Sequence, residues 1–481
     1  MTISSPPDSR DCALVIGGSM AGLLAARILA DHYREVVLLE ADAFPSSPMQ
    51  RRGVPQGPHS HALLAGGLKI FNNLFPGFSD DLASAGATKG DVGGQVLWFM
   101  EGACLRRVTT GVEAFGMTRP LIDHCVRERI RALQNIRVVE NTRVDGLTLT
   151  SDRRRVNGVS VNNSVVHADF VVDATGRGSL APRWLEHYGY RRPQEETLDI
   201  ELRYTTRLFR RRAADLNGDT ALIIGPSPSG KRGGLMIAQE GERWIVTLIT
   251  YFGEPVKSDL AGFVEFARTL PAPFIYDVIR NAEPVGEAHT TRFPTSIRRR
   301  YERLKRFPAG FLVFGDALSS FNPMYGQGMS CAAKQAMELD LVLRSRERNV
   351  ARRFFSRAAT IIDSAWNLAA CNDLRLPEAT GARTLPVRMM MWYVPQVLRA
   401  SRDDATIMLA FLKAQAMLVP PTQLLHPSIA LRVLGAALAR PLRGRPFRRS
   451  RQPNEMSTDV PRAATAELAH TTSATDPRRA G

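Results

Sequence analysis

The segment that most restricts the fold of this chain is residues 11–40, DCALVIGGSMAGLLAARILADHYREVVLLE. A short apolar run, Cys12–Ile16, leads into a glycine-rich turn, and an alanine- and leucine-rich helical pattern follows. A second apolar run, Val36–Leu39, stops at the acidic residue Glu40. This order of strand, glycine-rich turn, helix and strand is typical of the first βαβ unit of a dinucleotide-binding fold. An ordinary strand–turn–helix is the alternative, and the complete order of the parts argues against it.

Each part of this unit has a physical role. Gly17 permits the tight turn after the strand, the small Ser19 lets the backbone approach a pyrophosphate, and Gly22 lets the helix pack close to the sheet. The free N–H groups at the start of the helix would face the phosphates. Glu40 lies 18 residues past Gly22, where its carboxylate can accept hydrogen bonds from ribose hydroxyls. An acid at this place favours an unphosphorylated ribose, so FAD or NAD rather than NADP.

The composition sets outer limits on the fold and location. A chain of 481 residues with 44% hydrophobic residues can fill about two or three domains. Its five cysteines are scattered and lack metal-ligand spacing, so we expect no disulfide framework and no metal site. The N-terminal segment lacks a basic region before its apolar stretch, and no apolar run reaches the roughly 18 residues of a membrane span. We therefore expect a cytoplasmic protein.

The net charge of +16 is partly concentrated near the C-terminus. Seven arginines and no acid lie between Arg432 and Arg451, and the polar residues beyond them favour a disordered tail. A solvated tail is the simplest interpretation of this segment. Contact with an anionic membrane surface is the alternative, which would make the protein peripheral at the membrane. We expect no nucleic-acid partner.

Two further motifs place polar residues at the ends of apolar strands. Asp173-Ala174-Thr175-Gly176-Arg177-Gly178-Ser179 follows the run Phe170–Val172. Gly315-Asp316 follows Phe311–Phe314 and precedes the loop Asn322–Ser330, NPMYGQGMS. An acid at the carboxyl end of a strand can bind ribityl or ribose hydroxyls. The helix that begins near Met329 would direct N–H groups at an anion such as a reduced flavin.

Together, the three motifs resemble those of FAD-dependent monooxygenases of the aromatic-hydroxylase and squalene-epoxidase superfamily, over roughly residues 10–435. The loop RRGVPQGPHSHALL (residues 51–64) and the form NPMYGQGMS resemble most closely the bacterial polyene epoxidases of polyether antibiotic pathways. The resemblance implies that a flavin C4a-hydroperoxide inserts one oxygen atom from O2 into a lipophilic substrate. The expected reaction is the epoxidation of an alkene or polyene. The substrate would be a polyketide or a terpenoid of secondary metabolism. Aromatic hydroxylation and a geranylgeranyl-reductase-like alkene reduction are the alternatives.

A flavin-dependent halogenase is a weaker match. The tryptophan-pair motif of that class is missing from the sequence, and Leu23-Leu24 stands where a lysine would follow the first glycine turn. The resemblance also leaves the source of electrons open, since no second dinucleotide fingerprint follows residue 180. Either NAD(P)H reacts directly with the protein, or a partner flavin reductase supplies reduced flavin.

The resemblance implies specific FAD contacts. The pyrophosphate turn would comprise Gly17, Gly18, Ser19, Met20, Ala21 and Gly22, with Ser19 replacing the glycine of the family pattern. Glu40 would bind the adenosine ribose, and Val144 would lie near the adenine through its backbone. Arg51 (with Arg52 as its competitor) would lie near the ribityl–phosphate region, and Arg119 would open a helix that lies against the cofactor. The remaining contacts would be Asp173, Asp316, Pro323, Gly328 and Met329, the last three against the isoalloxazine. Pro58 departs from the family, which has a basic residue there.

The resulting fold class is α/β (α+β), with a Rossmann-like FAD-binding domain interleaved with an antiparallel-sheet substrate domain and followed by a helical region. We expect the FAD-binding domain in residues 10–80, 115–182 and 292–345, and the substrate sheet in 81–114 and 183–291. Residues 346–435 would be helical and 436–481 a basic tail, and residues 258–285 also have a helical pattern.

The sequence assigns no catalytic acid or base, and epoxidation does not strictly need a general base from the protein. His59, His61 and His124 have a structural interpretation. Met389–Met391, Trp392 and Met417 would cover the core or, alternatively, form a pliable wall for a long apolar substrate.

Overall fold

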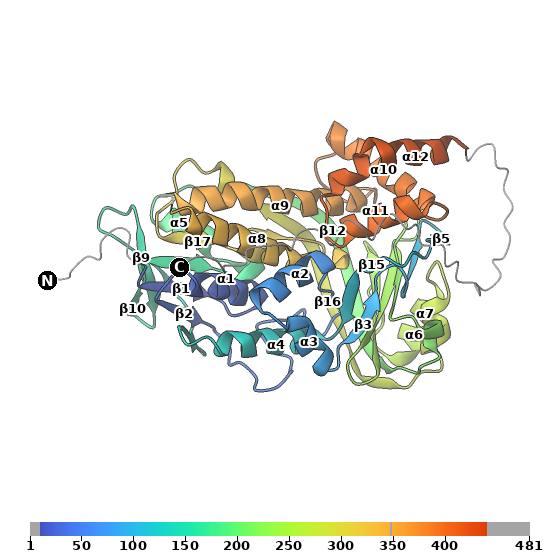
Figure 1. Cartoon of the computed structure of the whole chain (residues 1–481), viewed down its shortest axis with the longest axis horizontal. Helices are drawn as coiled ribbons and strands as arrows, with labels where there is room; N and C mark the ends of the chain where they lie inside the picture. Colours follow the sequence, from blue (N-terminus) through green and yellow to red (C-terminus); the bar gives the residue numbers. More distant parts are fainter. Residues whose placement is uncertain (1–9, 347–348, 440–481) are drawn as a thin grey trace, which may run out of the picture. The chain divides into compact units, whose positions relative to one another are not determined.

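A computed structural model describes residues 10–346 and 349–439 (Figure 1). The described residues up to Ala437 form one compact unit. The expected basic tail falls on residues 440–481, outside the described residues, except that residues 436–439 end a helix instead of starting the tail. None of the described helices combines the length and apolar character needed to cross a lipid bilayer.

A five-stranded parallel sheet carries the first and second motifs. Its order is β17-β11-β1-β2-β7, and every neighbouring pair runs parallel. The bounds are β1 Cys12–Ile16, β2 Glu35–Leu39, β7 Ile136–Val139, β11 Phe170–Asp173 and β17 Phe311–Val313. These strands read as nearly unbroken apolar runs because helices and a second sheet cover both faces of a parallel sheet. The carboxyl ends of β1, β2, β11 and β17 therefore bring distant motifs to one edge.

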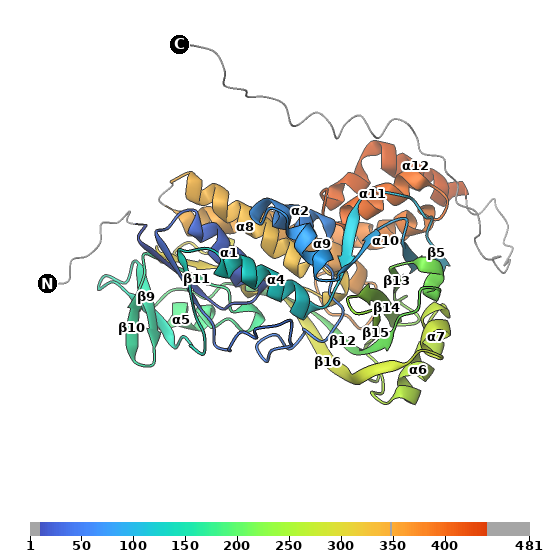
Figure 2. The same ribbon diagram turned by 60° about the horizontal axis from the view of Figure 1, so that its bottom comes forward.

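Helices pack against this sheet on one side. Helix α1 lies beside α8 and α4 (Figure 2), and α2 also packs on α8. The bounds are α1 Met20–Ala30, α2 Ala65–Leu74, α3 Phe78–Ser84, α4 Arg119–Arg131, α5 Ala181–His187 and α8 Gly328–Arg344. A small antiparallel sheet packs against β11 through its middle strand, with β8 Gly146–Leu149, β9 Val156–Val161 and β10 Ser164–His167. Short 3-10 helices in the connections near this sheet are η1 Gly176–Gly178, η3 Tyr301–Arg303, η4 Gly315–Ala317 and η5 Pro323–Tyr325.

The second large sheet has eight strands in the order β18-β16-β12-β15-β14-β13-β4-β5. Its pairs are antiparallel except β13 with β4. The bounds are β4 Val96–Met100, β5 Ala103–Cys104, β12 Glu195–Arg210, β13 Ala221–Ile224, β14 Arg232–Gln239, β15 Arg243–Tyr251, β16 Pro284–Arg299 and β18 Ser319–Ser320. Its apolar face packs on α6 Leu260–Arg268 and α7 Phe274–Ile279, with η2 Asp215–Gly218 nearby. A separate pair joins β3 Thr88–Asp91 to β6 Glu113–Gly116.

One expected domain boundary is wrong, and one segment that we expect to be helical is helical only in part. The limit at residue 291/292 cuts β16, which continues through Arg299 beside β12. The helical pattern of residues 258–285 is two short helices followed by the start of β16. Pro271 and Pro273 explain the break, because proline cannot donate within a helix and restricts the residue before it.

The C-terminal region is helical, as expected. It contains α9 Val350–Asp373, α10 Leu385–Ala400, α11 Ala405–Gln415, η6 Pro421–Leu425 and α12 Pro427–Ala439. Asp404 begins α11 by accepting hydrogen bonds from the N–H groups of Thr406 and Ile407. Met389 and Trp392 are 63% and 55% exposed on the outer face of α10, so for these two residues both the expected core packing and the alternative of an apolar wall are wrong. Met417 is buried in the core, as the simpler interpretation predicts.

Candidate flavin and substrate site

The turn after β1 needs glycine at two positions. Gly17 has φ +97°, and its N–H donates to the Leu39 carbonyl at 2.8 Å. A Cβ on Gly17 would lie 2.9 Å from the Ala174 oxygen, and one on Gly22 would lie 1.7 Å from the Gly17 oxygen. The start of α1 is therefore pressed directly against the end of the sheet. Ser19 precedes α1 without a side-chain cap, and no acid lies in the first turn, which leaves the N–H groups of that turn available to an anion.

Glu40 and Arg51 are both joined to this turn. Glu40 Oε2 accepts a hydrogen bond from the Gly18 N–H at 2.6 Å and lies 3.2 Å from Arg51 Nη1. Arg51 Nη2 also donates to the Gly18 carbonyl at 3.0 Å. The side chain of Arg52 is 95% exposed, so Arg51, and not its competitor, contacts the glycine-rich turn.

The loop after β7 reaches the same place. The Thr142 N–H donates to the Glu40 carbonyl at 2.8 Å, and the buried Val144 follows two residues later in this loop. The ring of Phe44 lies below three guanidinium groups, with Arg51 at 5.0 Å and Arg127 at 5.3 Å from its centroid. Arg127 is buried, and its Nε and Nη2 have no hydrogen-bond partner among the described residues. These are unsatisfied donors that a polar ligand could use.

Sequence reasoning missed Arg127, although a signal existed. Arg119, Asp123 and Arg127 are spaced four residues apart, which places them on one face of α4. Arg119 Nε donates to Asp123 Oδ1 at 2.8 Å, and Arg119 Nη2 donates to Ser19 Oγ at 3.1 Å. This polar face of α4 therefore lies along the glycine-rich turn.

Asp316 is the acid at this edge whose oxygens are available to a ligand. Gly315, at φ +66°, approaches α1 so closely that a Cβ there would lie 2.5 Å from the Ala21 Cβ. Burial raises the pKa of the Asp316 carboxyl, while the charges of Arg119 and Arg177 oppose that shift. Within residues 10–346 and 349–439, no group donates a hydrogen bond to this carboxylate. A Cβ on Gly328, the first residue of α8, would lie 3.9 Å from Asp316 Oδ1.

Asp173 is placed differently from Asp316. Its Oδ1 accepts hydrogen bonds from the Thr175 N–H at 2.9 Å and the Thr175 hydroxyl at 2.6 Å. Its Oδ2 accepts one from the Ser179 hydroxyl at 2.6 Å. The carboxylate therefore organises its own turn, and any effect on a cofactor would act through the backbone of that turn.

The third motif forms a tight loop in front of α8. Asn322 Oδ1 accepts a hydrogen bond from the Met324 N–H at 3.0 Å, and Gly326 closes the loop at φ +64°. Pro323 is exposed, Gly328 is half-buried and Met329 is buried. Helix α8 begins without a side-chain cap or an acid in its first turn. Gly328 thus opens a second helix whose N-terminal N–H groups lie near Asp316.

The histidines have structural environments. His59 is held at both ring nitrogens by hydroxyls, with Nδ1 2.8 Å from Thr206 Oγ1 and Nε2 2.8 Å from Thr291 Oγ1. Burial lowers the pKa values of His59 and His61 to about 3, so both rings are neutral. His124 lies on α4, where its Nδ1 is buried without a hydrogen-bond partner in the described part of the chain.

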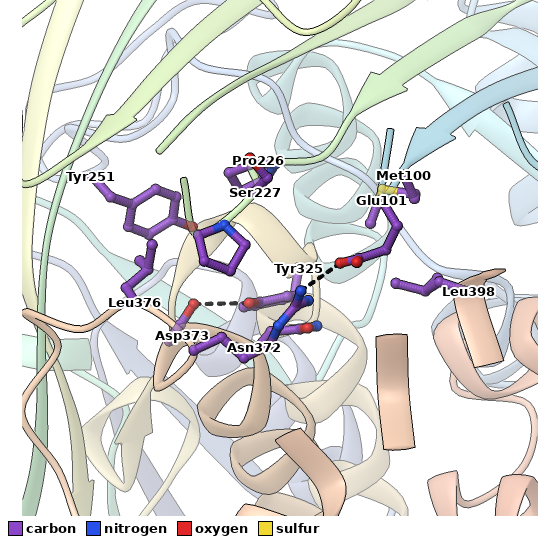
Figure 3. Close-up of a pocket in the computed structure, with 12 residues that line it drawn as sticks. Met100, Glu101, Pro226, Ser227, Tyr251, Tyr325, Asn372, Asp373, Leu376 and Leu398 are labelled. Carbon is purple, nitrogen blue, oxygen red and sulfur yellow. Dashed lines mark hydrogen bonds and ion pairs between the residues drawn. The ribbon is translucent and has the colours of Figure 1, made fainter. Parts of the chain in front are cut away.

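A pocket lies between the ends of the eight-stranded sheet, the third motif and the helices α9 and α10 (Figure 3). Its lining residues are Met100, Glu101, Pro226, Ser227, Pro228, Tyr251, Tyr325, Asn372, Asp373, Arg375, Leu376 and Leu398. Asp373 is hydrogen-bonded to Tyr325 of the third motif at 2.8 Å. Burial raises the pKa of Asp373 to about 7. Sequence reasoning missed both Asp373 and the pair Glu101–Arg375.

A comparison with known proteins finds a full-length relative. The chain is 33% identical to Protein Rv3254 of Mycobacterium tuberculosis (strain ATCC 25618 / H37Rv) over 469 residues, covering 90% of this chain and 94% of that protein. The chain belongs to the protein family of Rv3254. No family model matches the chain. The similarity covers nearly the whole length of both chains. The name of this relative does not identify a reaction.

Solved structures confirm the predicted fold class. The flavin-dependent brominase Bmp2 matches with TM-score 0.61 at 13% identity, covering 90% of this chain and 99% of that chain. A flavoprotein/dehydrogenase from Cytophaga hutchinsonii matches with TM-score 0.63 at 14% identity, covering 91% and 100%. The p-nitrophenol 4-monooxygenase PnpA from Pseudomonas putida DLL-E4 matches with TM-score 0.61 at 15% identity, covering 86% and 99%. At these identities the likeness shows that this member of the Rv3254 family has the same fold as these flavoproteins.

Proposed function

We propose that this protein is an FAD-dependent monooxygenase that inserts one atom of O2 into a lipophilic substrate. The observation that carries the proposal is the position of Asp316. Its carboxylate lacks a hydrogen-bond donor among the described residues and lies close to the start of α8, while the preceding residue Gly315 lies against the start of α1. Free carboxylate oxygens suit ribityl hydroxyls, and the two uncapped helix starts suit a pyrophosphate and an anionic ring.

The residues fit an elongated FAD molecule. Glu40 and Arg51 would hold the adenosine ribose, with the free donors of Arg127 close by. The turn after β1, together with Arg119, would hold the pyrophosphate. Asp316 would bind the ribityl chain, and the loop from Pro323 to Met329 would lie along the isoalloxazine. Bound FAD, once reduced, supplies the electrons and activates the O2.

Epoxidation of an alkene or polyene is the reaction that we propose first. The apolar members of the pocket wall, such as Met100, Leu376 and Leu398, support a lipophilic substrate. Hydroxylation of an aromatic ring is the second candidate. It is supported by the polar group of Asp373 and Tyr325 inside the same pocket, because an alkene offers these groups no hydrogen-bonding partner.

Turnover with isotopically labelled O2 tests the proposal. The purified protein is given reduced FAD and a panel of polyenes and phenols, and products are read by mass spectrometry. One labelled oxygen atom in an epoxide or a phenol supports the respective candidate, whereas a saturated product without label indicates an alkene reductase. Added bromide should yield no halogenated product. A second series with NADH, NADPH or a flavin reductase identifies the electron donor.

The Asp316→Asn variant is expected to bind FAD about 10-fold to 100-fold more weakly than the wild type. Asparagine keeps the shape but loses the charged acceptor, and a hydrogen bond to a charged group contributes about 1.5–3 kcal/mol. The measurement is the dissociation constant of FAD from its fluorescence quenching by the apoprotein. Asp80→Asn, in an exposed turn of α3, is the matched control and should bind FAD as the wild type does. If the Asp316→Asn variant and the wild type bind FAD with equal affinity, the Asp316 carboxylate does not contribute to FAD binding.

A further inference from the structure

The substrate pocket contains one buried acid that the proposed FAD contacts do not use. Asp373 is the last residue of α9 and is 2% exposed. Its Oδ1 accepts a hydrogen bond from the Tyr325 hydroxyl at 2.8 Å (Figure 3). The same oxygen accepts a second hydrogen bond from Asn322 Nδ2 at 2.9 Å. Its Oδ2 is buried and has no hydrogen-bond partner among the described residues. A buried carboxylate oxygen without a donor is costly, so it is a strong site for an incoming donor.

The other charged groups of the pocket are paired with each other. Glu101 Oε1 lies 2.6 Å from Arg375 Nη2, and Glu101 Oε2 lies 2.9 Å from Arg399 Nη2. The opposing influences on the Asp373 carboxyl are burial, which raises its pKa, and the hydrogen bonds from Tyr325 and Asn322, which lower it. In the part of the chain that the structure describes, Asp373 is therefore held by neutral partners.

The groups around Asp373 decide whether a pH effect near neutrality can be assigned to this residue. Tyr325 from η5 and Tyr251 from the end of β15 are both buried, which raises their pKa values well above the usual range. Both therefore stay neutral. The other charged groups that line this pocket are Glu101, from the turn after β4, and Arg375, which follows α9, and they contact each other at 2.6 Å. A change in ligand binding around pH 7 would consequently report Asp373 itself.

We propose that Asp373 binds the hydroxyl group of an otherwise apolar, uncharged ligand, with Oδ2 accepting its hydrogen bond. The proposal rests on the proposed function, because it names the substrate class of the same pocket. A phenol or an alcohol supplies the required donor, and the apolar wall takes the rest of the molecule. A methyl ether lacks the donor. A carboxylate would bring a second negative charge beside Asp373.

The test compares ligands that differ only in the group that replaces the hydroxyl. 4-Ethylphenol and 2-naphthol are titrated into the protein as purified, each beside its methyl ether, with 2-naphthoate as the anionic analogue. Isothermal titration calorimetry gives the dissociation constants. Each phenol is expected to bind at least about 10-fold more tightly than its ether, as a charge-assisted hydrogen bond implies. We expect 2-naphthoate to bind at least about 10-fold more weakly than 2-naphthol.

The ratio between the affinity for a phenol and the affinity for its methyl ether should also depend on pH. Between about pH 6 and pH 8.5 the carboxyl of Asp373 loses its proton, while a phenol with a pKa near 10 stays neutral. The preference for the phenol over its ether should therefore rise several-fold over this interval in the wild type. This measurement needs no variant, so it holds even if a substitution at Asp373 prevents folding.

The Asp373→Asn variant should lose both effects, with a phenol-to-ether ratio within about 3-fold and no pH dependence. Asp80→Asn serves again as the control and should retain the wild-type ratio and profile. Absence of phenol binding, a pH-independent ratio in the wild type, or an unchanged ratio in Asp373→Asn overturns the proposal. If Asp373-dependent binding occurs without any oxygenated product, the binding site stands and the proposed function fails. If oxygenation occurs while the ratio is independent of Asp373, the proposed function stands and the binding site fails.

Discussion

The Gly22→Ala variant is expected to be purified without flavin, with its affinity for FAD reduced at least about 100-fold. The added methyl group would lie 1.7 Å from the Gly17 oxygen and 2.9 Å from the Gly17 carbonyl carbon, both backbone atoms. Either the turn or the start of α1 must therefore move. Gly17 has little freedom to do so, because its N–H is bonded to Leu39 and Ala174 closes the space beside it. Displacing this turn removes the N–H groups that face the pyrophosphate.

The measurement is the FAD content of the purified protein, together with the dissociation constant of FAD for the apoprotein. Gly435→Ala is the matched control, since a Cβ on Gly435 in α12 would have no described atom within 4 Å. It should retain flavin like the wild type. Circular dichroism separates the loss of flavin from the loss of the fold. A folded Gly22→Ala protein with a full complement of FAD would show that the turn does not hold the cofactor.

Local patterns in the sequence predict the framework of this site well. The glycine spacing after β1, the acid after β2 and the acid after β17 each describe a few consecutive residues whose backbone geometry is fixed by sterics. Because parallel strands end at one edge of a sheet, the strand order alone predicts that Glu40 and Asp316 lie at the same edge. The same rule predicts a place for Asp173, but it does not reveal that Thr175 and Ser179 donate hydrogen bonds to both of its oxygens.

The polar part of the pocket could not be predicted in this way. Asp373 meets Asn322 across 51 residues and Glu101 meets Arg399 across 298 residues, with no local pattern linking either pair. Nothing in the sequence around Asp373 distinguishes it from a surface acid at the end of a helix. The sequence also does not predict the orientation of α10. Its Met389 and Trp392 belong to an apolar pattern, but they lie on the outer face. Such features depend on tertiary packing and not on periodicity.

The Glu101→Gln variant is expected to lower the stability of the folded protein by about 2–4 kcal/mol. Glu101 lies in the two-residue turn between β4 and β5, and its carboxylate contacts Arg375 and Arg399. Its carbonyl also accepts a hydrogen bond from Arg402 Nη2 at 2.5 Å. Removing the one negative charge leaves three neighbouring arginines that repel each other, two of them largely shielded from water. The partial exposure of Arg399, at 37%, keeps the loss below that of a fully buried pair.

This loss should appear in the thermal unfolding midpoint of the protein as purified. Unfolding entropy scales with chain length, so for a chain of this size each kcal/mol corresponds to about 1 °C, and the expected decrease is about 2–4 °C. Glu113→Gln provides the matched control, because Glu113 pairs with Lys89 on the surface and both side chains are about half exposed. Its midpoint should shift by less than about 1 °C, as exposed ion pairs contribute little. Equal shifts in the two variants would mean that Glu101 does not stabilise the contact between the hairpin and the helical region. Higher salt should narrow the difference between Glu101→Gln and the wild type only slightly, since burial protects this cluster from screening.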